Sequence, residues 1–168
     1  MEYRIVKKEA MKFIALVRSF PNEIINDETD HSIPDFWDEC YDCGLIEPLR
    51  RLYPKGKRDL YGLCSSKLDD DNRFRYAIGM LIDDTIPLPI AEELSASGFT
   101  IWETGPAEYT VFLCKGTDGS CIAQAWNRFY REFLPQTGYH QSEQTDYELY
   151  PERNEGGLFC ELWIPIER

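Results

Sequence analysis

Two glutamates near the C-terminus lie in apolar and aromatic surroundings, where a carboxylate can do chemistry. Glu148 lies between a tyrosine and a leucine, and Glu161 is followed two residues later by Trp163. A carboxylate withdrawn from water beside aromatic rings can be the counter-charge of a cation, or, with a raised pKa, a general acid or base. The alternative for Glu161 is an ordinary surface carboxylate, or one paired with an arginine such as Arg75. For Glu148 both interpretations stay open.

Strand alternation predicts which face of a sheet these glutamates share. In the segment 158–166, Leu162 and its alternate neighbours suit a helix-covered core, whereas Glu161 and Trp163 point to the other face. If Tyr147 lies in that core, Glu148 joins Glu161. Aromatic residues are more often core than ligand contacts, and alternation favours the site only for two of them, Trp163 and Tyr150. The predicted ligand-binding residues are Glu148, Tyr150, Glu161, Trp163, Tyr109 and Trp102, with Glu161 as the candidate catalytic residue.

The cysteines and histidines do not form a recognisable metal, redox or nucleophile motif. The chain has six cysteines: Cys40, Cys43, Cys64, Cys114, Cys121 and Cys160. Cys40 and Cys43 form a CxxC at the C-terminal end of an expected helix, where the helix dipole does not activate a thiol. Zinc would need a second ligand pair, and His31 and His140 lie in polar loops without a serine or cysteine partner. We expect six reduced, mostly buried thiols, no metal and no cofactor.

The acidic composition argues against a nucleic-acid partner. The net charge is −12, from 18 Lys and Arg against 30 Asp and Glu in 168 residues, so the chain repels phosphates. The longest basic stretch, residues 55–58, contains a glycine and fits a solvated turn. The N-terminus lacks the apolar run of a signal peptide, and no stretch approaches the roughly 18 apolar residues of a membrane span. We therefore expect a cytoplasmic protein without nucleic-acid or membrane contact.

An internal repeat organises the chain into two halves. Each half reads as two strands, a helix and two further strands. The aligned segments are 3–6 with 99–102, 13–17 with 109–113, 59–64 with 145–150, and 74–82 with 158–166. The two helices carry Trp37 and Trp126 at equivalent positions of a buried stripe, and we expect Gly44 and Pro135 to end them.

The repeat predicts an α+β fold with two ββαββ halves related by a pseudo-two-fold axis. We expect one domain over residues 1–168, with halves at 1–83 and 98–168 and a linker at 84–97. The antiparallel sheets would have both helices packed on one side and a concave ligand cleft on the other. In the first half, mostly small residues would leave that cleft open: Gly62, Cys64, Ala77, Gly79 and Leu81.

The order and spacing of four segments resemble the GyrI-like small-molecule-binding domain, the effector-binding domain of AraC-type and MerR-type multidrug regulators. The segments are Gly105-Pro106-Ala107-Glu108-Tyr109-Thr110-Val111-Phe112, Ala125-Trp126-Asn127-Arg128-Phe129-Tyr130, Asp146-Tyr147-Glu148-Leu149-Tyr150 and Glu161-Leu162-Trp163-Ile164-Pro165-Ile166. The resemblance covers essentially the whole chain and is strongest after Phe99. It implies an aromatic cleft with one or two buried carboxylates that attract lipophilic cations, at Glu148 and Glu161. Some stand-alone relatives look like hydrolases that open the cyclopropane of natural products.

Three functions follow from these expectations. The first is a stand-alone domain that senses or sequesters a small lipophilic, cationic molecule. The second is a hydrolase of a strained electrophile with Glu161 as general acid or base. The third is a protein-interaction module that binds a partner through the groove or a sheet edge. No helix-turn-helix precedes the first strand at Tyr3, so we do not expect this chain alone to regulate DNA.

Overall fold

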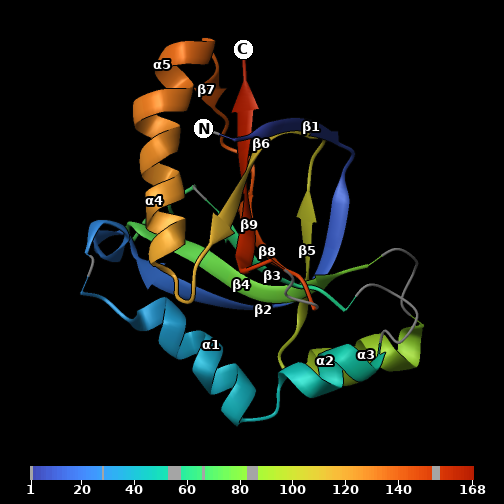
Figure 1. Cartoon of the computed structure of the whole chain (residues 1–168). Coiled ribbons are helices and arrows are strands. Elements are labelled where there is room, and N and C mark those ends of the chain that lie inside the picture. The colour runs from blue at the N-terminus through green and yellow to red at the C-terminus, as the bar shows by residue number, and fades with distance from the viewer. Residues whose placement is uncertain (1, 28, 53–57, 66, 83–86, 153–155) are drawn as a thin grey trace.

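One strongly curved antiparallel sheet with helices on one of its faces forms the protein (Figure 1). The computed structural model describes residues 2–27, 29–52, 58–65, 67–82, 87–152 and 156–168. The fold is α+β, as the sequence predicts. In the described part of the chain, no helix is both long enough and apolar enough to cross a membrane.

The sheet has nine strands, and its order is β1-β6-β9-β8-β3-β4-β2-β5, with the short β7 beside β9. The strands are β1 (Arg4–Lys8), β2 (Met11–Pro21), β3 (Leu60–Ser65), β4 (Arg73–Leu81), β5 (Thr100–Thr104), β6 (Ala107–Lys115), β7 (His140–Gln141), β8 (Asp146–Tyr150) and β9 (Leu158–Glu167). Each half donates its first strand to the other, because β1 pairs with β6 and β5 pairs with β2.

The strand order reads the same from both ends when each strand is exchanged with its repeat partner. Strands β1, β2, β3 and β4 correspond to β5, β6, β8 and β9, and the two halves meet where β3 pairs with β8. This order agrees with the internal repeat, and the superposition of the two halves stays a prediction.

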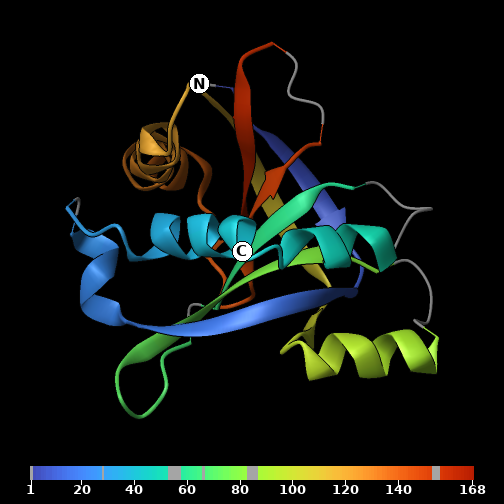
Figure 2. The same cartoon turned by 90° about the horizontal axis from the view of Figure 1, so that it is seen from below.

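Helices from both halves cover one face of the sheet, and two apolar clusters lie beneath them (Figures 1 and 2). The helical elements are η1 (Asn22–Asn26), α1 (Ser32–Asp42), α2 (Ile46–Leu52), α3 (Leu88–Ala96), α4 (Ser120–Arg128), η2 (Phe129–Phe133) and α5 (Leu134–Thr137). One cluster packs Phe36 and Cys40 of α1 onto β2, β3 and β4. The other packs Ala125 and Phe129 onto β6 and β9, where Leu162 lies on the helix-covered face as alternation predicts.

The opposite face of the sheet is filled by side chains from strands alone. Phe13, Tyr61, Tyr109, Tyr147 and Trp163 belong to a third cluster there, together with Trp102. Their rings lie edge to face or stacked, and they are all buried. Strand alternation predicts an open cleft on this face. That expectation is wrong for the described residues, because large aromatics from neighbouring strands pack beside Ala77 and Gly79 on this face. Gly62 and Cys64 lie on the helix-covered face instead.

Two helical segments differ from the expected boundaries. Residues 88–96 of the expected linker form α3, because Leu94 packs into the core, and residues 84–86 lie outside the described residues. The second-half helix does not end at Pro135. It continues through a π-type turn, Phe129–Phe133, to Thr137, and Pro135 lies directly after that turn. Gly138, with φ of 73°, ends it.

The six cysteines are free thiols in this structure, and four of them are buried. Cys64 is partly buried and Cys43 is exposed, so the expectation of mostly buried thiols is confirmed. The basic stretch of the sequence analysis lies largely outside the described residues, because 55–57 are not among them.

Candidate functional site

Glu148 lies on β8 at the junction of the two halves, on the face that carries the helices. It pairs with Gly62 of β3 on one side and with Leu162 of β9 on the other. Leu162 packs under α4, and paired residues of an antiparallel sheet share a face. Glu161 pairs with Leu149 instead, so the two glutamates lie on opposite faces. The expectation that both glutamates share a face is therefore wrong. A shift of one residue in the pairing of β8 with β9 is enough to exchange the two faces of a strand.

Three aromatic side chains form a hydrogen-bonded chain that ends on the Glu148 carboxylate. Tyr76 of β4 donates its hydroxyl to Glu148 Oε1 at 3.1 Å, and Tyr150 donates to the same oxygen at 2.9 Å. Trp37 of α1 donates Nε1–H to the Tyr76 hydroxyl oxygen at 2.9 Å. The carboxylate is therefore tied to strands of both halves and, through Tyr76, to helix α1.

Gly62 provides the space in which Tyr76 reaches Glu148. A Cβ atom at Gly62 would lie 2.1 Å from the Tyr76 hydroxyl oxygen and 3.2 Å from Glu148 Oε1. The contact with Tyr76 is shorter than real Cβ atoms make, so any other residue at position 62 would push Tyr76 away. The first-half position equivalent to Glu148 must be empty for the network to form.

The environment of Glu148 changes its acid–base behaviour. Burial raises the pKa of Glu148 to about 7, although the hydrogen bonds from Tyr150 and Tyr76 act in the opposite direction. Solvent still reaches part of the residue. Two residues earlier on β8, burial and the charge of Glu148 raise the pKa of Asp146 well above its usual range. Near neutral pH, Glu148 therefore exchanges between the charged and neutral forms.

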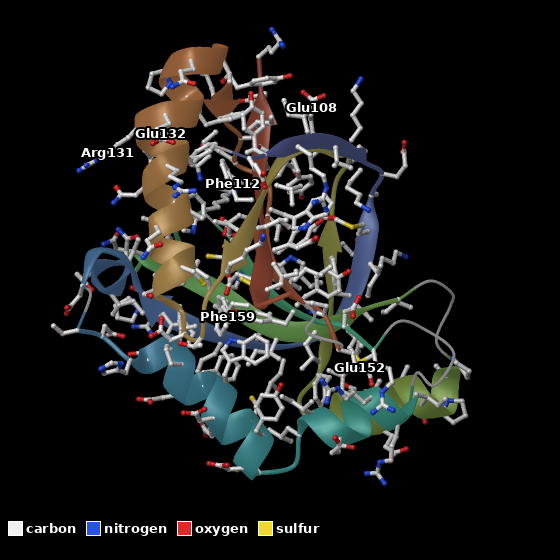
Figure 3. The ribbon with its side chains drawn as sticks, viewed as in Figure 1. Glu108, Phe112, Arg131, Glu132, Glu152 and Phe159 are labelled. Atoms are coloured by element: carbon white, nitrogen blue, oxygen red, sulfur yellow. The ribbon has the colours of Figure 1, made fainter. Side chains whose placement is uncertain are left out.

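Aromatic rings surround the network on its helix side. Trp37 lies with its ring centroid 5.0 Å from that of Tyr150, and Phe159 lies 5.7 Å away from Tyr150, both in edge-to-face geometry. Figure 3 shows Phe159 projecting into the angle between α1 and α4. Trp37, Tyr150 and Phe159 are each only partly buried. A carboxylate of near-neutral pKa thus has accessible aromatic surface beside it.

Glu161 lies on the other face and has local partners. Its Oε2 lies 3.2 Å from Arg4 Nη2, and its Oε1 accepts a hydrogen bond from Trp163 Nε1 at 3.1 Å. The arginine partner is Arg4 rather than Arg75, whose guanidinium lies 5.1 Å from the ring centroid of Trp102. With 18% of its side chain exposed, Glu161 is an ion-paired residue at the rim of the concave aromatic cluster.

Tyr109 and Trp102 are inside that concave cluster and hold the start of β8. Both bond to Thr145, Tyr109 to its carbonyl oxygen at 3.0 Å and Trp102 to its hydroxyl oxygen at 3.1 Å. Burial raises the pKa of Tyr109 to about 12, so its hydroxyl stays protonated. Ligand contact by Glu161, Trp163, Tyr109 and Trp102 stays a prediction, and their packing does not favour it.

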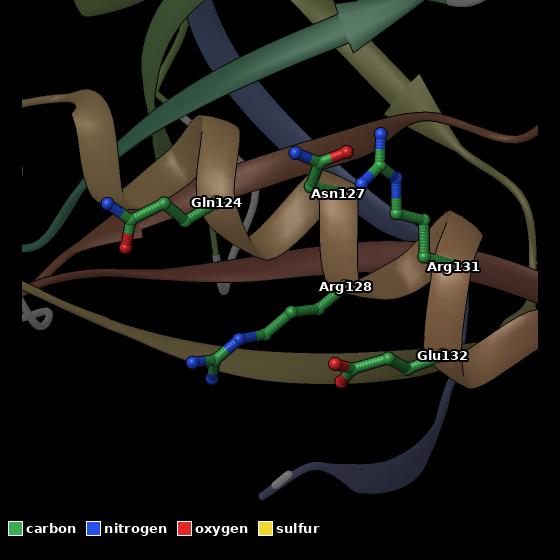
Figure 4. A pocket seen from close by; sticks show the side chains of 5 residues that line it. All are labelled: Gln124, Asn127, Arg128, Arg131 and Glu132. Carbon is green, nitrogen blue, oxygen red and sulfur yellow. The ribbon is translucent and has the colours of Figure 1, made fainter.

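Two hollows on the surface lie beside α4 rather than at Glu148. The first, of about 310 Å³, is lined by polar and charged side chains on the outer side of the helix (Figure 4): Gln124, Asn127, Arg128, Arg131 and Glu132. The second, of about 400 Å³, lies between α4 and β6. Within the described residues, no group of three or more His, Cys, Asp or Glu side chains could hold a metal ion.

Sequence reasoning missed three residues around Glu148, namely Trp37, Tyr76 and Phe159. Trp37 was assigned to a buried structural stripe, but it is partly exposed and bonds to Tyr76. Tyr76 and Phe159 had no assignment. The usable signal for Tyr76 is its position between Phe74 and Ile78, because all three alternate onto the helix-covered face.

Sequence comparison assigns the chain to a family. A family model described as the GyrI-like small molecule binding domain matches residues 1–167. The chain therefore belongs to the GyrI-like family of small-molecule-binding domains. No curated protein matches the sequence.

Solved structures with a similar fold include ligand-bound, regulatory and hydrolase proteins. SAV2435 bound to tetraphenylphosphonium has a TM-score of 0.74 at 19% identity, over 99% of this chain and 94% of that one. A putative bacterial transcription regulation protein from Staphylococcus aureus MU50 has a TM-score of 0.73 at 19% identity, over 100% of this chain and 99% of that one. A hydrolase from Listeria innocua has a TM-score of 0.60 at 10% identity, over 99% and 92%. At these identities the likeness establishes the shared fold.

Proposed function

We propose that this chain binds small lipophilic cations at Glu148, on the helix-bearing face, and so senses or sequesters them. Glu148 would supply the counter-charge, and Trp37, Tyr150 and Phe159 would supply π-faces for stacking and cation–π contact. Among the described residues, both hydrogen bonds to this carboxylate go to Oε1. The second oxygen is the one we expect to face a bound cation.

One observation carries this proposal: a partly accessible carboxylate has a pKa of about 7 because it is withdrawn from water among aromatic rings. A desolvated anion attracts a cation more strongly than a hydrated one does. A lipophilic cation also loses little hydration on entering an apolar site. The net charge of −12 favours the approach of cations. The structurally similar SAV2435 binds such a cation, tetraphenylphosphonium.

The direct test is calorimetric titration of tetraphenylphosphonium into the wild type and two variants at pH 8. Glu148→Gln keeps the shape of the side chain but removes the charge, so we expect affinity to fall by more than about tenfold. Glu161→Gln removes an equal charge from the other face, and its affinity should stay within about twofold of the wild type. Neutral triphenylphosphine oxide should bind wild type and Glu148→Gln alike. Equal cation affinity of wild type and Glu148→Gln would contradict the proposal.

A second candidate function is hydrolysis at the same carboxyl group. A carboxyl group of pKa about 7 can accept a proton from water and return it near neutral pH. Tyr76 and Tyr150 would add hydrogen-bond donors, and the Listeria innocua hydrolase has a similar fold. Incubation with an activated cyclopropane tests it, because water addition and ring opening add 18 Da to the substrate. Product formed by wild type but not by Glu148→Gln would favour hydrolysis, whereas binding without product would favour the first candidate.

A further inference from the structure

Three cysteines gather on β6, β9 and α4, on the helix-bearing face but outside the network around Glu148. Cys114 of β6 and Cys160 of β9 are direct partners in the strand register. Both belong to the cluster under α4, with 2% and 0% exposure. Cys121 of α4 lies in the same cluster. The fold therefore brings thiols from three separate segments together.

The backbone geometry allows a bond between Cys114 and Cys160. Directly opposed residues of an antiparallel pair have Cα atoms about 4.5–5.5 Å apart, within the roughly 4.4–6.8 Å that a disulfide spans. Their side chains are close enough that each thiol shifts the pKa of the other. The strand register thus places the two cysteines within the range of a disulfide.

A hollow of about 400 Å³ leads to this group. Its lining includes Cys114 and Cys121, with Lys115 and Arg128 among the polar side chains. Strand β1 pairs with β6 only as far as Val111. The hollow lies along the edge of β6 beyond that residue. A molecule the size of hydrogen peroxide fits easily.

We propose that Cys114 and Cys160 are a redox pair that a small peroxide converts into a cross-strand disulfide. The Cys114 thiolate attacks one peroxide oxygen, the O–O bond breaks, and the products are a Cys114 sulfenic acid and, after protonation, water. The Cys160 sulfur then attacks the Cys114 sulfur, and the sulfenic oxygen leaves as a second water with the Cys160 proton. Two thiols and one hydrogen peroxide thus give one disulfide and two waters.

The assignment of the two roles follows from how the thiols interact. The hydrogen bond from Cys160 lowers the pKa of Cys114, whereas the same hydrogen bond and burial raise the pKa of Cys160. Cys114 also lines the hollow, whereas Cys160 is not among its lining residues. Cys114 is thus the first nucleophile, and Cys160 resolves the sulfenic acid.

Thiol counting by mass spectrometry tests this pair without any ligand, so the result is independent of the proposed function. The full chain is treated with hydrogen peroxide and then alkylated with N-ethylmaleimide in denaturant. Reduced protein should take up six labels, one for each cysteine. Oxidised protein should lose two hydrogens and take up four labels, since two of the six thiols are consumed. A peptide map should join Cys114 to Cys160, and dithiothreitol should restore all six.

Variants separate the two steps. Cys160→Ser should stop at a sulfenic acid that dimedone traps on Cys114, and Cys114→Ser should give no disulfide. Cys43→Ser, which removes the exposed thiol, should still form the Cys114–Cys160 bond. Six labels on peroxide-treated wild type, or a disulfide mapped to Cys40–Cys43 or Cys114–Cys121, would overturn the proposal.

Discussion

Gly62 and Glu148 face each other across the β3–β8 junction, at positions that the sequence alignment of the two halves matches. One half supplies a carboxylate there and the other half supplies no side chain. This difference breaks the symmetry at its central pair and leaves space for the Tyr76 hydroxyl. The strand pair at the centre of the sheet can thus hold a single charged group, because the residue opposite it is glycine.

The first prediction concerns this space. Gly62→Ala places a Cβ 2.1 Å from the Tyr76 hydroxyl oxygen, so Tyr76 must move and release Glu148. We expect a loss of about 1–3 kcal/mol in the free energy of unfolding, measured by urea denaturation. Tetraphenylphosphonium binding should weaken as well. The control is Gly119→Ala, because nothing lies within 4 Å of a Cβ there. Equal stability of both variants would contradict the role of Gly62.

The second prediction is the pH dependence of stability. The pKa of Glu148 rises from an ordinary 4.5 to about 7 on folding, so between these values the folded chain holds a proton that the unfolded chain releases. The contribution of this group is complete below about pH 4.5 and is lost as pH rises through 7. Glutamine at position 148 cannot titrate, so the Glu148→Gln variant does not lose this contribution as the pH rises. The unfolding free energy of the variant minus that of the wild type should therefore increase from pH 4.5 to pH 8. Urea titrations at several pH values measure the difference, and parallel pH profiles would exclude the assigned pKa.

The third prediction concerns Tyr76. Its hydroxyl stabilises the charged form of Glu148 by donating a hydrogen bond. Tyr76→Phe removes that donor, so the pKa of Glu148 should rise further. Because a cation binds the ionised form, the pH midpoint of tetraphenylphosphonium affinity should move upward. Trp37→Phe is the matched variant, because Trp37 donates its hydrogen bond to Tyr76 and not to Glu148, and phenylalanine keeps an aromatic ring there. It should therefore move the midpoint less. A midpoint unchanged in Tyr76→Phe would show that the hydrogen bond does not tune the site.

The sequence predicted the strands, the family and the face of β9, but it placed Glu148 on the wrong face. Alternation shows which residues of one strand share a face. Which residues of the neighbouring strand lie on that same face depends on the pairing register of the two strands. On β8 this register could not be inferred, because Tyr147 and Glu148 lie against packed side chains on either face. A strand buried on both sides has no polar face to fix its orientation.

The prediction of a concave cleft was wrong for a different reason. Small residues such as Ala77 and Gly79 suggested empty space, yet side chains of strands remote in sequence fill it. How far a sheet curls depends on long-range pairing, here β1 with β6 and β5 with β2, and no local pattern encodes it. The role of Trp37 was missed because the apolar stripe of a helix predicts that a residue is buried. The stripe does not predict which hydroxyl group accepts the hydrogen bond of the Trp37 indole.

The last prediction separates the two faces of the sheet. The Tyr147 ring stacks on Trp163 with centroids 5.3 Å apart and lies in the concave cluster. Tyr147→Ala should therefore cost about 3–5 kcal/mol of unfolding free energy, as truncations of buried aromatics do. Glu161→Gln removes the ion pair with Arg4, whose side chain is 48% exposed, while the glutamine oxygen can still accept the hydrogen bond from Trp163. This change should cost about 0–1 kcal/mol.

These outcomes distinguish a structural face from a binding face. If the concave cluster is structural, Glu161→Gln leaves both stability and tetraphenylphosphonium affinity close to wild type, while Tyr147→Ala lowers stability. If the concave face instead holds the ligand, Glu161→Gln removes the charge beside Trp163 and affinity falls without a matching loss of stability. Urea denaturation and calorimetric titration of the same two variants decide between them, because only binding at Glu161 makes affinity fall while the unfolding curve stays unchanged.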